Sequence, residues 1–478
     1  MAAEAPPSFD FDVVIFGASG FTGKYVIREA LKFISSPNCP LKSLALAGRN
    51  PSKISDALTW AASPCPPPPI PIVFADVSDP SSLLTLVRRT RLVLNCVGPF
   101  RLYGHPVVAA CVEAGTDYLD ICGEPEFMER MELEHHERAK SAGSLVISAC
   151  GFDSIPAELG FMFHSRQWDP PAAPNQVEAY LVMESDRRLV GNIGTYESAV
   201  LGVANTSTLQ NLRRSRPRRS RPQIPGPACR PKLIEQQNSL GVWSLKLPSA
   251  DATVVRRTLS SLTENPQGLQ GVAETEEFTE KRRGFWPTVK PAHFGVKIGL
   301  KSLWGLLRVM LTGIFISLLG VSVFGRKLLL KFPGIFSLGM FSKRGPSQEE
   351  VRCASFKMWF VGLGYSDVSR AAEGSVSCDT EIITRVSGPE VGYVATPIIL
   401  IQCAIIILSQ RHNLPDGGVY PPGIVFGATD LQERLQANGI CFDFVSKRPL
   451  RLTYAYTYNV CIQLLSNSDS REYHVIHS

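Results

Sequence analysis

The residues of this chain with the most distinctive chemical spacing are three glycines near its amino terminus. They belong to a G-x-x-G-x-x-G turn that consists of Gly17, Ala18, Ser19, Gly20, Phe21, Thr22 and Gly23. Glycine allows a tight turn and a close approach of backbone to pyrophosphate, whose charge suits the positive end of a following helix dipole. An ordinary glycine-rich turn would have the same composition. Here a β-branched apolar run precedes the turn and a helical pattern follows it, which favours a dinucleotide site.

The end of the second predicted strand indicates which dinucleotide binds. The strand ends Leu46-Ala47-Gly48-Arg49, without the carboxylate that contacts the ribose 2′-OH of NAD. A guanidinium is suited to bidentate contact with the 2′-phosphate of NADP. The sequence therefore predicts NADP(H) rather than NAD(H), with Arg49 at the 2′-phosphate. The alternative is that Arg49 is a solvated charge at a strand end.

Further cofactor contacts are expected where the third and fourth strands end. Asp76 follows the third strand, at a place where such folds contact adenine, although Asp is also a common turn residue. After the fourth strand, a Gly-Pro pair breaks the chain where the nicotinamide half would lie. The predicted contacts there are Asn95, Cys96, Val97 and Gly98.

Polar side chains that could transfer a proton gather beyond the fourth strand, and a dehydrogenase needs such a group near the hydride path. They lack the Tyr-x-x-x-Lys spacing of short-chain dehydrogenases, and those next to prolines fit helix starts equally well. The catalytic residue therefore stays unassigned. The twelve cysteines form no C-x-x-C pair and no zinc-type cluster with histidine, so no metal is predicted. The candidates are Arg101, Tyr103, His105, Asp120, Glu124 and Asp153.

These side chains require a parallel sheet to position them. Over residues 10–150, short apolar runs rich in β-branched residues alternate with helical patterns. The predicted fold class is α/β: an N-terminal Rossmann-type parallel sheet with helices on both faces, plus a second α/β domain with a mixed sheet and an apolar helical segment. The predicted strands are 11–16, 44–47, 72–75, 92–97, 118–121 and 144–148.

A basic segment, residues 205–232, lies in the second domain. No acidic residue occurs between Ser198 and Leu233. The segment is interpreted either as a solvated loop or as a contact with anionic lipid. Phosphorylation of Ser215 and Ser220 would weaken a lipid contact.

An apolar region, residues 294–342, contains an uncharged stretch at 309–325 between two arginines. As a helix this stretch would measure about 25 Å, against a hydrocarbon core of about 30 Å. Cations on both sides suit insertion into one leaflet or into a lipid-droplet monolayer. A buried core helix or a dimer interface fits the same length, and the two interpretations stay open.

Composition sets broad limits on function. The chain has 478 residues, 44% of them hydrophobic, and a formal net charge of +6. This charge is modest for the length, so we expect no nucleic-acid partner. The acidic first residues do not fit a secretory signal, and an intracellular location is expected.

Several long stretches resemble the saccharopine dehydrogenase family, and specifically its saccharopine dehydrogenase-like oxidoreductases. They include VVIFGASGFTG (13–23), LAGRNPSK (46–53), SACGFDSIPAELG (148–160) and GPEVGYVATP (388–397). The resemblance implies NADP(H) use and an association with membranes or lipid droplets, but not saccharopine as substrate. It also implies the following division: 1–9 a tail, 10–150 the Rossmann domain, 151–387 the second domain, 388–445 a part that returns to the Rossmann domain, and 446–478 an atypical tail.

The leading hypothesis is an NADP(H)-dependent oxidoreductase that acts on a carbonyl, imine or enoyl group of a small-molecule or lipid substrate at a lipid surface. The alternative is a non-catalytic cofactor-binding or structural protein of lipid droplets. Saccharopine oxidation is disfavoured because no arginine cluster stands out to hold a tricarboxylate. A homodimer and a mitochondrial location are left open.

Overall fold

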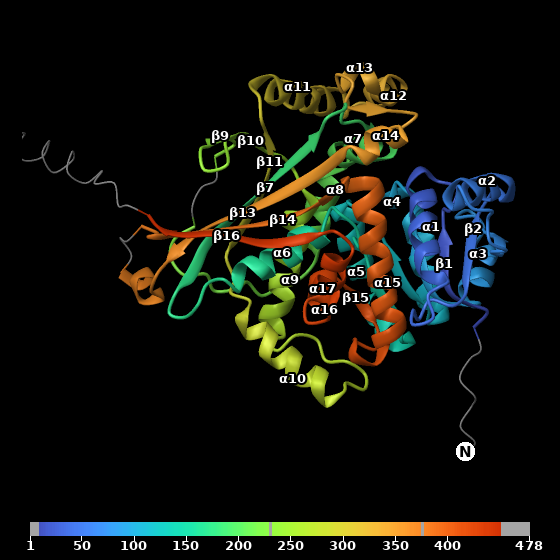
Figure 1. Ribbon diagram of the computed structural model, residues 1–478, viewed down its shortest axis with the longest axis horizontal. Helices are drawn as coiled ribbons and strands as arrows, with labels where there is room; N and C mark the ends of the chain where they lie inside the picture. The colour runs from blue at the N-terminus through green and yellow to red at the C-terminus, as the bar shows by residue number, and fades with distance from the viewer. Residues whose placement is uncertain (1–8, 229–231, 374–376, 451–478) are drawn as a thin grey trace, which may run out of the picture.

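The amino-terminal part of the chain folds around a parallel sheet in a computed structural model, which describes residues 9–228, 232–373 and 377–450. Sheet A has seven strands, all parallel, in the order β15-β6-β5-β4-β1-β2-β3 (Figure 1). This order is that of a doubly wound dinucleotide fold with one extra strand. The predicted fold class is confirmed. Its strands are β1 (Phe11–Phe16), β2 (Leu44–Gly48), β3 (Ile72–Phe74), β4 (Thr90–Asn95), β5 (Asp117–Asp120), β6 (Leu145–Ile147) and β15 (Gly418–Tyr420).

The register of sheet A brings the predicted cofactor residues to one edge. Phe16, the last residue of β1, pairs with Ala47 of β2 and with Asn95 of β4. Because parallel strands end at the same edge, the glycine turn, Arg49 and the 95–98 segment lie side by side there. Ligands of open α/β sheets bind at this carboxyl-end edge.

Helices cover both faces of sheet A. On one face α1, α2 and α15 pack on Val13 and Ile15, and on the other α3, α4 and α5 pack on Val14 and Phe16. This alternation explains why the strands read as nearly continuous apolar runs. The helices are α1 (Phe21–Ile34), α2 (Pro51–Ala62), α3 (Pro80–Val87), α4 (Phe100–Ala114), α5 (Pro125–Ala142) and α15 (Thr396–Gln410).

Helix α15 and strand β15 come from the far end of the chain and complete the Rossmann domain. α15 packs against α1, and β15 pairs with β6. Among the described residues, one helical stretch is long and apolar enough to cross a membrane, Val391–Asn413, and 83% of its most apolar window is buried in the protein. This stretch is therefore the core helix of the fold.

Sheet B forms the second domain. It is mixed, since β7 and β11 run parallel while the other neighbours are antiparallel. Helices α6 (Ile155–Ser165) and α9 (Ala250–Glu264) lie beneath it, toward sheet A (Figure 1). In spatial order its strands are β16 (Cys441–Pro449), β14 (Thr380–Pro389), β13 (Ala354–Tyr365), β7 (Ala173–Ser185), β11 (His293–Leu300), β10 (Val242–Lys246) and β9 (Ile234–Gln237).

Strand β16 crosses the predicted boundary at residue 445. It pairs with β14 from Cys441 to Pro449, so the segment after β15 continues into sheet B. The first residues of the predicted atypical tail, 446–449, are thus part of a strand. Residues 451–478 lie outside the described residues.

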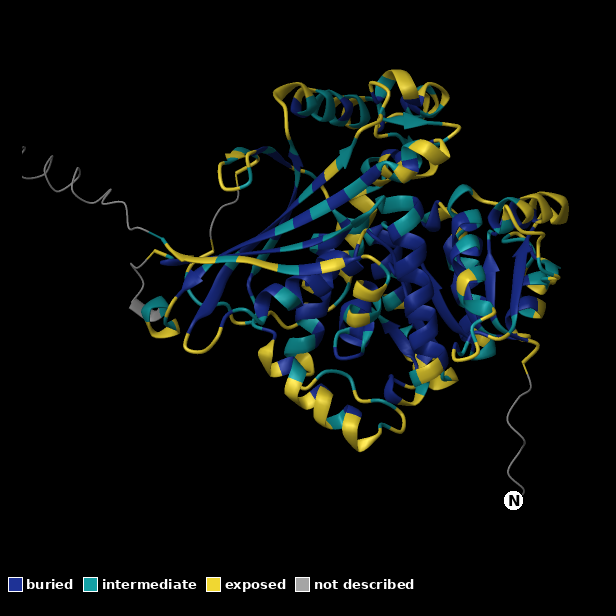
Figure 2. Cartoon of the chain, in the orientation of Figure 1, coloured by how far each residue is buried: buried dark blue, intermediate teal, exposed yellow. Residues whose placement is uncertain are grey.

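A group of apolar helices stands at one end of sheet B (Figures 1 and 2). The predicted single stretch 309–325 is divided, because α11 ends at Leu319 and α12 begins at Val323. Only Leu306 and Thr312 of α11 are buried, which excludes a core helix within this protomer. The group comprises α7 (Ile193–Ala204), α11 (Leu303–Leu319), α12 (Val323–Lys331), α13 (Pro333–Phe336) and a two-stranded sheet of β8 (Gly191–Asn192) and β12 (Phe341–Ser342).

The prediction of a solvated loop at 205–232 is wrong for the first part of this segment. Residues Thr206–Ser215 form helix α8, which packs on α5. Three arginines of the segment, Arg213, Arg216 and Arg219, are paired with carboxylates of the same chain, so they are not free for anionic lipid. Ser215 and Ser220 are exposed, and their phosphorylation stays a prediction. The remaining helices are α10 (Glu276–Phe285), α14 (Gln348–Arg352), α16 (Pro422–Phe426) and α17 (Leu431–Ala437).

Candidate cofactor site

The glycines of the turn are required by close backbone packing. Gly17 has a φ of +84°, and a Cβ there would lie 2.7 Å from Val97 Cγ2. A Cβ on Gly23, in the first turn of α1, would lie 2.3 Å from the carbonyl oxygen of Gly17. The Gly20 N–H closes the turn by donating to that oxygen at 2.9 Å. These contacts hold α1 tightly against β1.

The amino terminus of α1 is open to a ligand. The helix begins at Phe21 with Gly20 as its N-cap, and no side chain among the described residues caps it. First-turn N–H groups lack acceptors within the helix, so they are available to a phosphate. Ser19 is exposed and Thr22 half-buried beside this turn, and both carry hydroxyl donors. Ala18 is buried, and its N–H is held by the carbonyl of Ala47 at 3.3 Å.

Arg49 and Asp76 lie at the ends of adjacent strands. Arg49 is exposed, and the following residue, Asn50, caps α2 by accepting the Lys53 N–H at 3.0 Å. Hydrogen bonds from the N–H and Oγ of Ser78, with a smaller contribution from Arg49, lower the pKa of Asp76. The end of β2 therefore presents one exposed guanidinium and one lysine in the next helical turn.

Asn95 anchors a hydrogen-bond chain across three strand ends. Its side chain is buried, donates to the Tyr118 hydroxyl at 3.0 Å and accepts the Val97 N–H at 3.0 Å. Tyr118 donates to Asp120, which also accepts N–H groups of Cys122 and Ala149. Burial raises the pKa of Asp120 to about 6. This chain fixes the carboxyl ends of β4 and β5 and the residues that follow β6.

Cys96 and Gly98 follow the carboxyl end of β4. Burial raises the pKa of the Cys96 thiol to about 12, so it stays protonated and is a poor nucleophile at neutral pH. Gly98 is exposed, directly before α4. This segment therefore offers backbone and shape to a ligand, not acid–base chemistry.

Two predicted proton-transfer candidates, Arg101 and Glu124, bind each other. Glu124 accepts N–H groups of Phe100 and Arg101 and the hydroxyl of Ser198 at 2.9 to 3.2 Å. The Arg101 guanidinium pairs with Glu124 and Glu126 at 3.2 Å each, and all three side chains are at most 8% exposed. These groups connect α4, α5 and α7 and hold the edge of the site together.

A pair of carboxyl groups behind the strand ends is better suited to proton transfer. Asp153 lies against Gly123, where a Cβ would be 2.6 Å from Asp153 Oδ2. Asp153 is exposed, yet desolvation of its carboxyl group by the surrounding protein raises its pKa. Asp251, in the first turn of α9, is 6% exposed, and burial followed by repulsion from Asp153 raises its pKa to about 8. Its Oδ1 has no hydrogen-bond partner among the described residues.

Glu158 supports the same group from α6. It accepts hydrogen bonds from Thr258, Ser154 and the Gly423 N–H, and burial raises its pKa to about 7. Of these three carboxyl groups, only Asp153 was predicted from the sequence, and Asp251 and Glu158 were not. Their signal, a carboxylate inside an otherwise apolar helical face, is weak because many such residues cap helices.

The remaining candidates lie apart from these carboxyl groups. Tyr103 is 40% exposed on α4. His105, two residues further along α4, lies with its Nε2 3.3 Å from Glu134 Oε2 of α5. The structure therefore divides the six predicted polar residues into a positioning pair, two groups at the strand ends and two on α4, of which Tyr103 is exposed and His105 contacts α5.

Helix α7 joins the site to the apolar helices. On one side Ser198 donates to Glu124, and the Leu201 carbonyl accepts Arg101 Nη1 at 2.9 Å. On the other side Tyr196 and Val200 are buried against α11 and α12. A second contact joins the loop after β12 to the start of α1. Gly345 of this loop packs so closely on Phe21 that a Cβ there would lie 2.7 Å from the Phe21 ring.

The strand order, the glycine turn and the open helix end define a dinucleotide-binding protein of the Rossmann class. The saccharopine dehydrogenase NADP binding domain family matches residues 13–147, which confirms the expectation of NADP(H). The chain is 61% identical over 439 residues to a probable mitochondrial saccharopine dehydrogenase-like oxidoreductase of Arabidopsis thaliana, covering 91% of this chain and 97% of that one. It is 36% identical over 453 residues to a saccharopine dehydrogenase-like oxidoreductase of Rattus norvegicus, covering 93% and 99%.

A third relative carries a different name. The chain is 30% identical over 454 residues to the lipid droplet localized protein of Caenorhabditis elegans, covering 92% of this chain and 99% of that one. With these relatives the family is shown: the chain belongs to the saccharopine dehydrogenase-like oxidoreductases, NADP-binding proteins that act on small molecules.

Proposed function

We propose that this protein reduces or oxidises a carbonyl, imine or enoyl group of a lipid-type small molecule at a lipid surface. The observation that carries the proposal is an arrangement of three features: a dinucleotide edge, the carboxyl groups Asp153 and Asp251 behind its strand ends, and an apolar helical surface that α7 joins to this edge through Arg101 and Glu124. In this proposal the cofactor residues are Gly17, Ala18, Ser19, Gly20, Phe21, Thr22 and Gly23 at the pyrophosphate, Arg49 at the 2′-phosphate, Asp76 near adenine, and Asn95, Cys96, Val97 and Gly98 along the nicotinamide half.

Asp251 and Asp153 are proposed to handle the proton. NADPH supplies a hydride when bound, so reduction of a carbonyl or imine needs one proton from the chain or from water. A carboxyl group with a pKa of about 8 is protonated at neutral pH and can donate. Asp153, which reaches water, can return a proton to Asp251.

The lipid surface is supported by the exposed side of the apolar helices. Exposed apolar patches of this kind mark sites of interaction with proteins or membranes. Arg308, Lys327 and Lys331 lie among the apolar residues and suit anionic headgroups. The name of the Caenorhabditis elegans relative points to lipid droplets and that of the Arabidopsis thaliana relative to mitochondria. The most exposed large apolar residues of this group of helices are Leu303 (59%), Trp304 (71%), Leu318 (72%), Val321 (73%), Val323 (62%), Phe324 (77%) and Ile335 (67%).

The test is a titration of the purified chain with NADPH and NADH, beside Arg49→Glu. Loss of a charge-assisted bidentate contact costs about 1.5–3 kcal/mol, so NADPH affinity should fall roughly 10- to 100-fold. NADH affinity should change much less. Arg88→Glu is the matched control. Arg88 is exposed at the carboxyl end of α3, the end of this helix that lies away from the cofactor edge.

If neither NADPH nor NADH bound, the enzyme proposal would be overturned and a structural protein of lipid droplets would remain. If NADPH binds, turnover is measured with lipid carbonyls, imines and enoyls. NADPH binding without turnover of any of them would favour a non-catalytic cofactor-binding protein. A homodimer stays a prediction.

A further inference from the structure

We propose that His105, Glu134 and His135 form a binding site for Zn²⁺ between α4 and α5. One ligand atom from each residue can be chosen so that all three lie within 4.8 Å of one another. The two imidazole rings have centroids 5.2 Å apart, and His105 Nε2 lies 3.3 Å from Glu134 Oε2. The site is empty.

His135 is the observation that distinguishes this group from a surface cluster. It is only 3% exposed, and neither of its ring nitrogens has a hydrogen-bond partner among the described residues. A buried imidazole with both nitrogens unpaired is costly, and such a group in a native fold calls for an unseen partner. A metal ion bonded to one nitrogen supplies that partner.

The donor set selects the kind of metal. Two imidazoles and one carboxylate match the His₂Glu sets that hold Zn²⁺ with a fourth position open to water, whereas Mg²⁺ and Ca²⁺ prefer oxygen ligands. The rings must be neutral to bind. Burial, followed by the nearby His105 and Arg138, lowers the pKa of His135.

Other charges near the site act in both directions. Arg138 and Arg130 face His135 and oppose a dication, while Glu134 favours it. Since His105 and Glu134 are roughly 44% and 43% exposed at the side chain, water screens the arginines. We therefore expect a single Zn²⁺ site.

The site lies one helical turn from the cofactor edge. His105 follows Arg101 by four residues on α4, and Arg101 holds Glu124 at the start of α5. A metal that joins α4 to α5 at this point would fix the position of the Arg101–Glu124 pair without touching a substrate. The spacing of these residues in the sequence does not predict a metal site, because the ligands come from two helices and lie about 30 residues apart in the chain.

The experiment is equilibrium dialysis of the full chain against Zn²⁺, with metal measured per protomer, and a melting curve with and without Zn²⁺. We expect one equivalent bound and a higher unfolding temperature. His105→Ala and Glu134→Gln change partly exposed side chains, so they should fold. Each should weaken binding at least tenfold and abolish the thermal shift.

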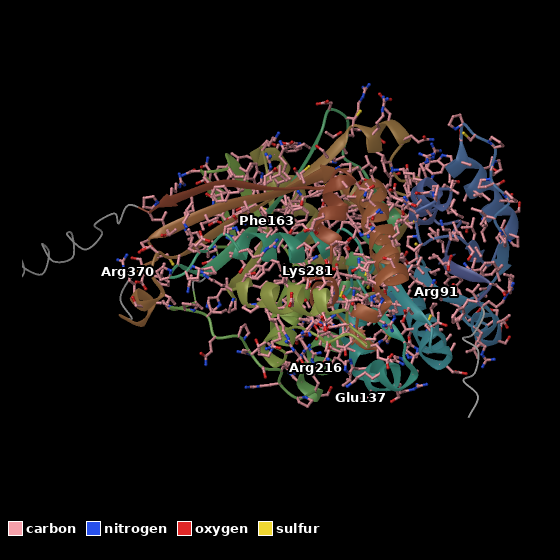
Figure 3. The ribbon with its side chains drawn as sticks, turned by 60° about the horizontal axis from the view of Figure 1, so that its bottom comes forward. Arg91, Glu137, Phe163, Arg216, Lys281 and Arg370 are labelled. Carbon is pink, nitrogen blue, oxygen red and sulfur yellow. The ribbon has the colours of Figure 1, made fainter. Side chains whose placement is uncertain are left out.

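Glu137→Gln is the matched control. It is the same chemical change on the same helix, labelled in Figure 3, and the Glu137 side chain is 86% exposed. Because exposed Cys65 and Cys441 can also bind zinc, Co²⁺ is used in parallel. A nitrogen and oxygen set gives visible bands without the near-ultraviolet charge transfer of a thiolate. Equal Zn²⁺ affinity in all variants, or thiolate bands, would overturn the proposal.

Discussion

At the scale of single residues, Asp251 links the candidate chemistry to stability. Its pKa in the folded protein is raised from 3.8 to about 8, chiefly by burial. The folded state therefore binds this proton more tightly than the unfolded state does. The stability that the protonated group contributes is complete below pH 4 and is lost as pH rises from about 4 through 8.

Asp251→Asn should remove this pH dependence, because the amide is neutral throughout. Relative to the parent, the variant should gain stability between pH 5 and 8, by as much as a few kcal/mol at pH 8. The measurement is the urea midpoint at pH 5, 6, 7 and 8. Asp76→Asn is the control, since the pKa of Asp76 is lowered and its titration lies below this range. Identical slopes in Asp251→Asn and the parent would contradict the assigned burial.

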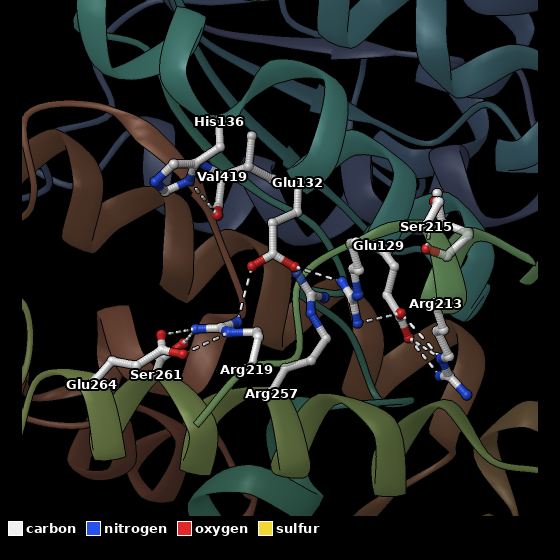
Figure 4. Close-up of polar contacts among 12 residues, drawn as sticks. Glu129, Glu132, His136, Arg213, Ser215, Arg219, Arg257, Ser261, Glu264 and Val419 are labelled. Carbon is white, nitrogen blue, oxygen red and sulfur yellow. Dashed lines mark hydrogen bonds and ion pairs between the residues drawn. The ribbon is translucent and has the colours of Figure 1, made fainter. Parts of the chain in front are cut away.

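At the scale of elements, an ionic network binds the segment after α7 to the core (Figure 4). Arg213 and Arg216 of this segment pair with Glu129 of α5 at 2.5 and 2.6 Å. Arg216 is labelled in Figure 3. Arg219 pairs with Glu132 of α5 at 2.9 Å and with Glu264 of α9 at 2.5 Å. Arginines that a composition argument assigns to solvent or lipid thus join α5, α8 and α9.

Arg219→Met should loosen this attachment. Arg219 is 24% exposed, so its pairs are partly screened and we expect a loss of about 1–2 kcal/mol at low salt, smaller at 0.5 M NaCl. Limited proteolysis within residues 205–228 should become faster. Arg218→Met, at an exposed neighbouring position, should leave the proteolysis rate unchanged. Equal rates in both variants would show that the network does not hold the segment.

The sequence predicted the Rossmann elements well because each of them combines a local signal with a repeated context. Gly17 and Gly23 are local requirements of one turn, and β1 and β4 are buried on both faces. The ion pairs of Arg219, the neighbourhood of Asp251 and the unpaired ring of His135 depend on contacts between segments distant in the chain. The uncharged stretch 309–325 failed as a single helix because Gly320 ends α11 and Ser322 caps α12.

At the scale of the whole molecule, the apolar helices should bind the protein to lipid. Trp304→Glu with Phe324→Glu removes two exposed aromatic side chains, each worth about 1.5–3 kcal/mol when fully buried. Flotation with phosphatidylcholine vesicles that contain anionic lipid should fall at least tenfold. NADPH affinity in solution should not change, which separates docking from cofactor binding.

Val272→Glu is the control for this change. Val272 is 56% exposed, and its N–H donates to the Leu414 carbonyl near the amino ends of the sheet A strands, away from the apolar helices. Flotation of this variant should equal that of the parent. Equal flotation of the double variant and the parent would contradict the lipid surface while leaving the cofactor site intact.

The return of α15 and β15 to sheet A has a consequence for synthesis of the protein on the ribosome. The strands of residues 11–147 emerge first, but the helix that covers one face of β1 and the strand that covers β6 follow some 250 residues later. At about 5–20 residues per second, this leaves apolar strand surface uncovered for tens of seconds. The nascent amino-terminal half is therefore a natural client for chaperones, and a transcript truncated before residue 396 would yield a chain that cannot close its own dinucleotide domain.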